Sequence, residues 1–170
     1  MGMQIQLQIP NDWKQKEGER PHIIQKFSGS GRLLGIAYVC ILQANELPME
    51  LQTFSETEIS DALFSPEMTE ESLPSGMKMT ISKRTEYDGQ PGQVFAYTGQ
   101  AERAGATVIT SGVVQRFIYK RKLITVTVTY GLVPVTGVKY QMKEIEDDVT
   151  RLPALAQLIG NSIVLMDMYE

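Results

Sequence analysis

The sequence predicts an α+β protein, an α/β/α sandwich with a central antiparallel sheet and a long C-terminal helix. Residues 77–132 are rich in β-branched and aromatic residues, and turn signals divide them into four strands. Apolar residues then recur at steps of three and four over 137–159, which predicts an amphipathic helix that covers one face of the sheet. With 170 residues, 42% of them hydrophobic, we expect 1–170 to form a single domain.

The N-terminal residues predict a strand followed by a corner. Residues 3–9 alternate between apolar side chains and glutamines, which is typical of a half-buried strand. The polar segment 14–20 is expected to cross solvent. Trp13, the only tryptophan, is expected to pack over the end of the sheet, because its indole ring is largely apolar.

Two short apolar runs, 22–27 and 33–42, predict a hairpin. The Ser-Gly-Ser-Gly segment at 28–31 joins them and is expected to form a flexible turn. Cys40 lies inside the second run, where a free cysteine behaves as a small apolar residue, so we expect it in the core.

Residues 55–72 predict two short helical turns. Ser55 stands three residues ahead of Glu58, which is the pattern of a capping box. Ser65 followed by Pro66 repeats the start signal, since proline suits the first helical position. The segment carries acidic residues and no basic one, so we expect a solvated face.

The four central strands reverse at three predicted turns. Asp88-Gly89 with Pro91-Gly92 marks the first, Ala104-Gly105 the second, and the basic run Lys120-Arg121-Lys122 the third. In the last strand the residues of one face are apolar or aromatic and those of the other are threonines, so one face is expected to need a cover.

The C-terminal helix is expected to provide that cover. Its apolar stripe runs from Val138 through Met142 to Ile159. Pro153 is expected to kink or split the helix, because proline removes one hydrogen-bond donor and crowds the preceding turn. Gly160-Asn161 is a stop signal, and 162–166 is expected to form an edge strand or a packed tail.

Several function classes are disfavoured by composition. The 16 basic and 20 acidic residues give a net charge of −4, which supplies no general attraction to nucleic acid or to an anionic membrane surface. One cysteine cannot form an intrachain disulfide or a thiolate metal cluster. The only histidine, His22, is interpreted as structural, because no nucleophile motif accompanies it. We therefore expect no enzyme, no metal and no cofactor.

Basic residues in the third turn suggest a docking patch for a protein partner. Phe117 and Tyr119 are interleaved with its members, and an acidic partner would match its charge. The same residues also have a structural explanation, because lysines at a hairpin tip protect a sheet against aggregation. The candidate residues are Arg116, Lys120, Arg121 and Lys122.

An alternative is a small-molecule carrier or weak hydrolase with a pocket between sheet and helix. A cavity lined by Tyr97, Tyr119 and Tyr130 together with carboxylates would favour it.

The sequence offers little on location and assembly. No run approaches the roughly 20 apolar residues of a membrane span, so no transmembrane segment is expected. Residues 1–10 resemble a strand rather than a signal peptide. Earlier removal of a targeting segment is our hypothesis, which slightly favours a periplasmic or otherwise exported protein. We expect a monomer or a weak homo-oligomer.

Six short sequence motifs, taken in their order along the chain, resemble the PsbP-like superfamily, which is the group of PsbP, Mog and DcrB type proteins. They are "IPNDW", "RPHIIQKF", "DGQPG", "ERAG", "FIYKRKLITVTVTYG" and "LIGNSI", and together they span nearly the whole chain. The resemblance implies an α/β/α sandwich and a non-enzymatic accessory or binding protein of bacterial type. Members of the superfamily dock on a photosystem, a small GTPase or secreted-effector segments, so the resemblance implies a protein partner without identifying it.

Overall fold

The computed structural model of the chain describes residues 3–168. Its elements in chain order are β1 (Ile5–Gln6), β2 (Lys14–Lys16), β3 (Ile23–Ser30), β4 (Ile36–Glu46), a 3-10 turn η1 (Met49–Leu51), α1 (Glu56–Leu63), α2 (Pro66–Glu71), β5 (Met77–Tyr87), β6 (Gln90–Arg103), β7 (Ala106–Tyr119), β8 (Lys122–Leu132), α3 (Met142–Asn161), β9 (Val164–Leu165) and η2 (Met166–Met168).

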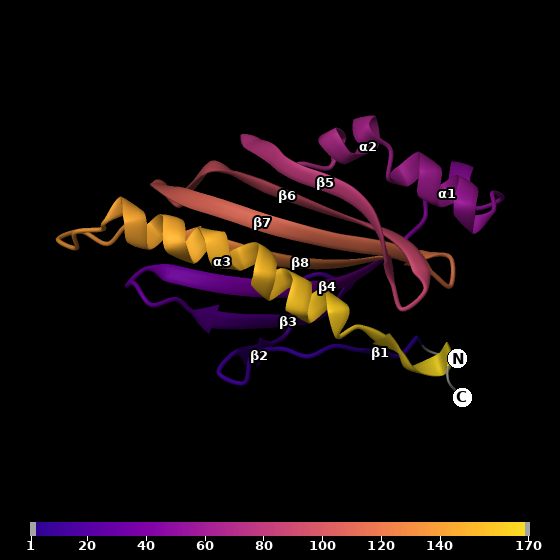
Figure 1. Cartoon of the computed structure of the whole chain (residues 1–170), viewed down its shortest axis with the longest axis horizontal. Helices are drawn as coiled ribbons and strands as arrows, with labels where there is room; N and C mark the ends of the chain where they lie inside the picture. The colour runs from indigo at the N-terminus through magenta and orange to yellow at the C-terminus, as the bar shows by residue number, and fades with distance from the viewer. Residues whose placement is uncertain (1–2, 169–170) are drawn as a thin grey trace.

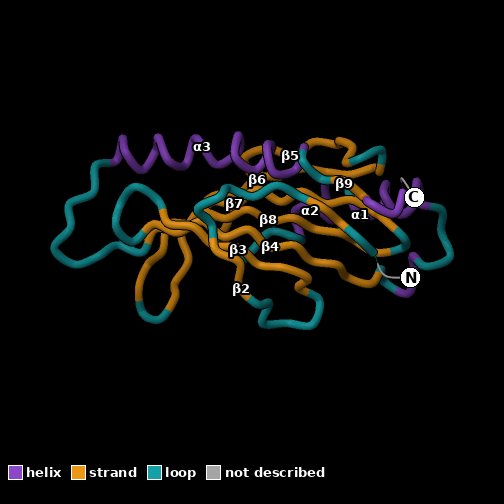
Figure 2. Tube along the Cα trace, turned by 90° about the horizontal axis from the view of Figure 1, so that it is seen from below, coloured by secondary structure: helices purple, strands orange, loops and turns teal. Residues whose placement is uncertain are grey.

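The sheet has seven antiparallel strands in the order β2-β3-β4-β8-β7-β6-β5 (Figure 1). The connection from β4 to the far edge strand β5 carries α1 and α2 across one face of the sheet. Helix α3 lies along the opposite face (Figure 2). The predicted α+β sandwich with a long C-terminal helix is therefore confirmed.

Four consecutive strands form the central meander, as predicted. The first two reversals each place one residue and then a glycine at positive φ, with Asp88 at 47° and Gly89 at 78°, then Ala104 at 50° and Gly105 at 79°. Such two-residue turns match the twist of the flanking strands. Pro91-Gly92 was expected in the first reversal, which is wrong, because both residues lie inside β6.

Both predicted helix starts are confirmed. The main-chain N–H of Ser55 donates to the Glu58 carboxylate over 2.8 Å, and the N–H of Glu58 donates to the Ser55 hydroxyl over 3.3 Å. These bonds complete a capping box. The main-chain N–H and the hydroxyl of Ser55 both donate to the Glu58 carboxylate, and they hold its pKa below the ordinary value. At α2, the Ser65 hydroxyl accepts from the N–H of Met68, and Pro66 occupies the first turn.

Helix α3 starts later than predicted and is not split by Pro153. It begins at Met142 rather than at 137 and runs through the proline to Asn161. Burial of Ile145, Leu152, Ala156 and Ile159 on the sheet outweighs the roughly 3 kcal/mol that an internal proline costs. The first residues of the predicted stripe, Val138 and Met142, are exposed.

The terminal segments pair with each other. Of the strand expected over 3–9, only Ile5–Gln6 is hydrogen-bonded as a strand, and it pairs with Val164–Leu165. Residues 3–9 nonetheless alternate between half-buried and exposed, as the pattern predicted. The edge strand expected near 162–166 is confirmed by the same pairing.

Two predictions for the first hairpin are wrong. Lys14–Lys16 does not cross solvent but pairs with β3 as an edge strand. The Ser-Gly-Ser-Gly segment is not the turn, because Gly29 lies inside β3, where Trp13 covers it so closely that an added Cβ would stand 2.4 Å from the indole. Trp13 stacks on Tyr38 at 5.9 Å between ring centroids, so it packs on the sheet face.

The core beneath α3 is formed by alternating residues of the central strands. Cys40 is completely buried there, as predicted, and burial raises the pKa of its thiol from 9.0 to about 12. Fully buried neighbours from β7 and β8 complete this layer and are Phe117, Ile124, Val126, Val128 and Tyr130.

The Cys40 thiol makes stability depend on alkaline pH. The folded protein keeps the Cys40 thiol protonated above pH 9, whereas the unfolded chain releases that proton. The thiol therefore contributes its full share of the unfolding free energy below pH 9, and this contribution is lost as the pH rises towards about 12. We expect Cys40→Ala to flatten the fall of the unfolding free energy between pH 8 and 10.5 by up to about 1.4 kcal/mol per pH unit. Urea titrations under reducing conditions measure it, and parallel curves for the two proteins would contradict it.

Candidate functional site

The β7–β8 turn differs from the other two turns of the meander. Lys120 and Arg121 both have positive φ, at 48° and 59°, and neither is glycine. The left-handed conformation costs an L-residue roughly 1–2 kcal/mol. The basic residues therefore occupy a strained turn in which glycine or asparagine would be more stable.

All three basic side chains of this turn are engaged. Lys120 forms an ion pair with Asp167, and Lys122 forms one with Glu46. Both ion pairs are partly exposed, so solvent screens them. The third residue, Arg121, behaves differently.

Arg121 joins the turn to the segment before α1. Its guanidinium donates hydrogen bonds to the main-chain carbonyls of Gln52 and Phe54. Carbonyl oxygens carry no formal charge, so these bonds hold the cation in place without neutralising it. Arg121 therefore presents a positive charge on an ordered side chain.

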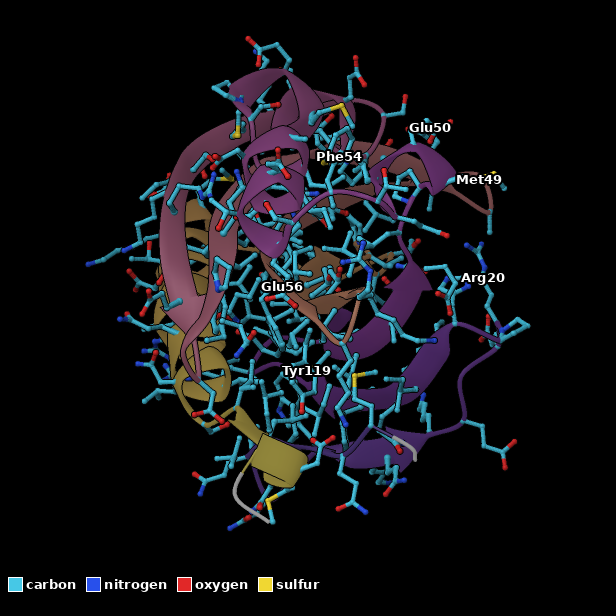
Figure 3. All side chains as sticks on the ribbon, turned by 90° about the vertical axis from the view of Figure 1, so that its right-hand side faces the viewer. Arg20, Met49, Glu50, Phe54, Glu56 and Tyr119 are labelled. Carbon is cyan, nitrogen blue, oxygen red and sulfur yellow. The ribbon has the colours of Figure 1, made fainter. Side chains whose placement is uncertain are left out.

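Two exposed apolar side chains lie at the same end of the molecule as the turn (Figure 3). Met49 is 81% exposed and Phe54 is 44% exposed. The sequence analysis missed both residues, because Leu47 and Leu51 in the same segment are also apolar and no local pattern separates exposed from buried side chains there. We call the five residues of this end the hairpin-tip surface: Met49, Phe54, Lys120, Arg121 and Lys122.

The fourth predicted docking residue, Arg116, lies apart from this surface. It is only 6% exposed, and burial lowers the pKa of its guanidinium to about 10. The side chain lies between the rings of Phe64 and Phe95, at 5.2 and 5.0 Å from their centroids. It also donates to the carbonyl of Leu63 at the end of α1. Arg116 therefore joins the α1–α2 segment to the sheet.

The three tyrosines suggested for a ligand pocket do not share one cavity. Tyr97 and Tyr130 contribute to a hollow of about 230 Å³ beside β4 and β8, whereas the Tyr119 hydroxyl donates to Asp167 near the turn. A separate cavity of about 260 Å³ does lie between the sheet and α3, with Lys83 and Tyr87 in its lining and no carboxylate.

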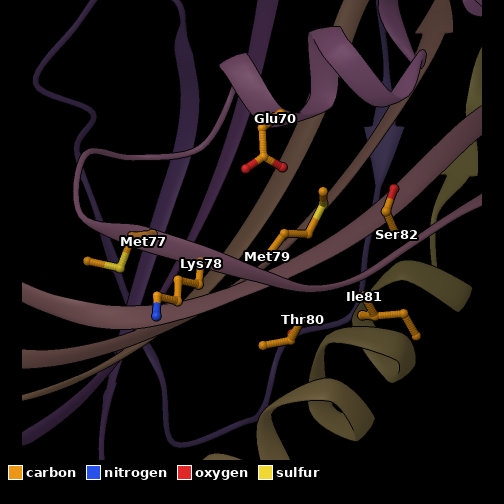
Figure 4. Close-up of a pocket in the computed structure, with 7 residues that line it drawn as sticks. All are labelled: Glu70, Met77, Lys78, Met79, Thr80, Ile81 and Ser82. Atoms are coloured by element: carbon orange, nitrogen blue, oxygen red, sulfur yellow. The ribbon is translucent and has the colours of Figure 1, made fainter.

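Strand β5 forms an exposed edge of the sheet that the sequence analysis did not single out. A bulge between Met79 and Ile81 opens a hollow beside α2 (Figure 4). Exposed Lys78, Lys83 and Arg84 line this strand, and such charges discourage edge-to-edge pairing with another sheet.

The other candidate features are a metal site, the single histidine and a membrane span, each within the residues that the structure describes. Over residues 3–168, no group of three His, Cys, Asp or Glu side chains is placed to hold a metal ion. His22 precedes β3, and its main-chain carbonyl accepts from the N–H of Ala44. Among these same residues, no helix has both the length and the apolar character that crossing a bilayer requires.

The architecture defines a class of small α+β sandwiches, and solved structures of that class match the chain. Mog1p, a Ran-binding protein of Saccharomyces cerevisiae, matches with a TM-score of 0.54 and 11% identity over 96% of this chain and 91% of its own. LpqN of Mycobacterium tuberculosis matches with a TM-score of 0.51 and 12% identity over 96% and 83%. PA94 of Pseudomonas aeruginosa, a protein of unknown function, matches with 0.50 and 17% over 95% and 96%.

These likenesses confirm the predicted PsbP/Mog-like architecture as a fold. Their identities of 11–17% concern the fold alone. No family model and no curated protein matches the sequence.

Proposed function

We propose that this protein is a non-enzymatic accessory protein that binds another protein through the hairpin-tip surface. The surface combines a fixed arginine with exposed methionine and aromatic side chains, and these residue types are enriched in the cores of protein interfaces. Mog1p, described as Ran-binding, is a precedent for a protein-binding role on this fold.

The observation that carries the proposal is the strained turn at Lys120 and Arg121. The same sheet places glycine second in its two other two-residue turns, so the fold itself does not need a basic pair here. Residues held in sparsely populated backbone conformations cluster at functional sites. The partly exposed contacts of Lys120 and Arg121 within the protein offset part of the strain, and a role of these side chains in binding accounts for the rest.

The surface also defines the chemistry of the partner. Its central cation, Arg121, fits a carboxylate, and the neighbouring Met49 and Phe54 fit an apolar contact. We therefore expect an acidic residue beside an apolar patch on the partner. We also propose a periplasmic or otherwise exported location, which agrees with the description of LpqN as involved in cell envelope biogenesis.

The variant Lys120→Asn/Arg121→Gly tests this function without a loss of stability. The Asn-Gly pair suits this turn type, so we expect its unfolding free energy to stay within about 1 kcal/mol of the parent value. Proteins crosslinked to it in the source cells, quantified by mass spectrometry, should include at least one whose recovery falls about tenfold or more, as expected for a lost interface residue.

A matched control removes the same number of charges elsewhere. Lys14→Asn/Lys16→Asn changes two exposed lysines on the edge strand β2. It should leave the recovery of that protein unchanged, and Phe54→Ala should reduce it. Equal recovery with all the variants would show that the hairpin-tip surface is not the binding site.

A further inference from the structure

A second surface lies at the other end of the molecule, far from the hairpin tip and from both termini (Figure 1). It consists of the β3–β4 turn at 31–35, the loop 133–141 and the first turn of α3. Figure 2 shows that the loop before α3 projects beyond the end of the sheet. We call these segments the loop end.

Apolar side chains are concentrated on the loop end. Met142 is 65% exposed and Leu34 is 63% exposed, and several exposed apolar side chains gathered in one place mark an interaction surface. The exposed apolar set consists of Leu34, Val133, Val135, Val138 and Met142. Val138 and Met142 belong to the apolar stripe predicted for the helix, but they lie beyond the sheet that covers the rest of that stripe.

Hydrogen bonds hold the two loops together, so the apolar set is presented as a unit. The Tyr140 hydroxyl donates to the carbonyl of Leu34 over 2.7 Å and accepts from the N–H of Val135 over 3.0 Å. The N–H of Val133 donates to the carbonyl of Gly35. Gly35 has a φ of 87°, and a Cβ there would stand 2.3 Å from the Val133 carbonyl oxygen, so only glycine permits this approach.

The charge of the loop end is opposite to that of the whole chain. Arg32, Lys139 and Lys143 are exposed, and none of them forms an ion pair with a carboxylate among residues 3–168. The first turn of α3 adds one exposed carboxylate, Glu144, so three basic residues and one acidic residue give these segments a net charge of +2, whereas the protein has a net charge of −4. The overall charge therefore hides a local basic cluster.

Apolar side chains surrounded by basic ones suit the interface of an anionic membrane. Apolar groups partition into the boundary between headgroups and acyl chains. Each lysine or arginine near an anionic surface strengthens binding by about fivefold, so the net charge of +2 contributes roughly 25-fold. A protein partner would require a complementary acidic and concave surface, whereas a fluid bilayer adapts to protruding side chains.

We propose that the loop end docks this protein on the surface of a membrane that contains anionic lipid. The apolar set enters the headgroup region, and Arg32, Lys139 and Lys143 contact lipid phosphates. Membrane docking is a second role, separate from the proposed protein-binding function. Docking through it leaves the hairpin-tip surface, at the opposite end, directed away from the membrane.

Vesicle co-sedimentation of the full chain tests the proposal. The vesicles contain 30% phosphatidylglycerol in phosphatidylcholine, or phosphatidylcholine alone. We expect binding to the anionic vesicles only, reduced about tenfold at 0.5 M salt, because salt screens the attraction. No binding to the anionic vesicles, or equal binding to both kinds, would overturn the proposal.

Matched variants assign the binding to the loop end. Leu34→Ser/Met142→Ser and Lys139→Glu/Lys143→Glu change exposed side chains, and we expect each to reduce vesicle binding about tenfold or more with an unchanged melting temperature. Met49→Ser/Phe54→Ser changes apolar side chains at the other end and should leave vesicle binding unchanged. Equal loss in that control would overturn the proposal. So would loop-end variants that lose a crosslinked protein while they keep full vesicle binding.

The two proposals fail separately. Loss of vesicle binding in the loop-end variants, with crosslinking at the hairpin tip intact, supports the membrane site. If the hairpin-tip variants lose the crosslinked protein while the loop-end variants keep full vesicle binding, only the protein-binding function is supported.

Discussion

Replacing Arg116 by methionine is expected to reduce the free energy of unfolding by about 3 kcal/mol or more. The side chain is buried and donates to Gln93 over 2.9 Å, to Ser72 over 3.1 Å and to the carbonyl of Leu63 over 3.1 Å. Methionine fills much of the volume but leaves buried acceptors without donors, and each such acceptor costs about 1–3 kcal/mol. The gain from removing a desolvated cation offsets only part of that loss.

Arg84→Met is the matched control for this measurement. The Arg84 guanidinium lies over the same Phe64 ring, at 5.3 Å from its centroid, but its side chain is 47% exposed. Its ion pair with Asp61 is exposed and contributes about 0–1 kcal/mol, and its guanidinium also donates to the buried Ser60 hydroxyl. The control therefore loses one hydrogen bond to a buried group, fewer than Arg116→Met loses, and it should lose less stability than that variant. Urea denaturation followed by circular dichroism measures both variants. Similar losses in the two would mean that burial of Arg116 does not decide its contribution.

Gly160→Ala is expected to reduce the free energy of unfolding by about 2 kcal/mol, although a helix normally favours alanine over glycine. Alanine stabilises a helix interior by roughly 1 kcal/mol relative to glycine. Here an added Cβ would stand 1.8 Å from the side-chain oxygen of Gln115, which is buried. The Gln115 amide donates to the carbonyl of Ala156 over 2.7 Å and accepts from the Tyr87 hydroxyl. Moving it breaks both hydrogen bonds in a buried place.

A double-mutant cycle isolates this contact. In a Gln115→Ala background the clash is absent, so the same Gly160→Ala change should become neutral or stabilising. Each member of the cycle is measured by thermal and urea denaturation. If Gly160→Ala destabilises both backgrounds equally, then the close approach of α3 to β7 is not the cause.

Local patterns in the sequence were sufficient for most elements of the fold. The capping box at Ser55 and the proline start at Pro66 depend on neighbours within four residues, and both are confirmed. The same holds for the reversals at Asp88-Gly89 and Ala104-Gly105, where glycine permits the positive φ. Errors arose where distant contacts overrode local signals, since Gly29 pairs with Tyr38 and packs against Trp13 within a strand rather than in a turn.

The candidate site was predictable only in part. The basic turn at 120–122 was identified from composition, and its role as a docking patch stays a prediction. Nothing in the local pattern separates Arg116 from this turn, because both lie in the same strand-turn segment. Side chains alternate along β7, and Arg116 lies on the face that α1 and α2 cover, so tertiary packing buries it.

The sequence by itself determined the class of fold, because residue period, turn residues and composition are local properties. The tertiary structure alone decided which basic residues are buried and which are presented. It also brought Gln52 and Phe54 beside the hairpin tip, and Leu34 beside the loop that precedes α3. These surfaces join segments tens of residues apart, and only the packing of the sheet and its covering helices brings such segments together.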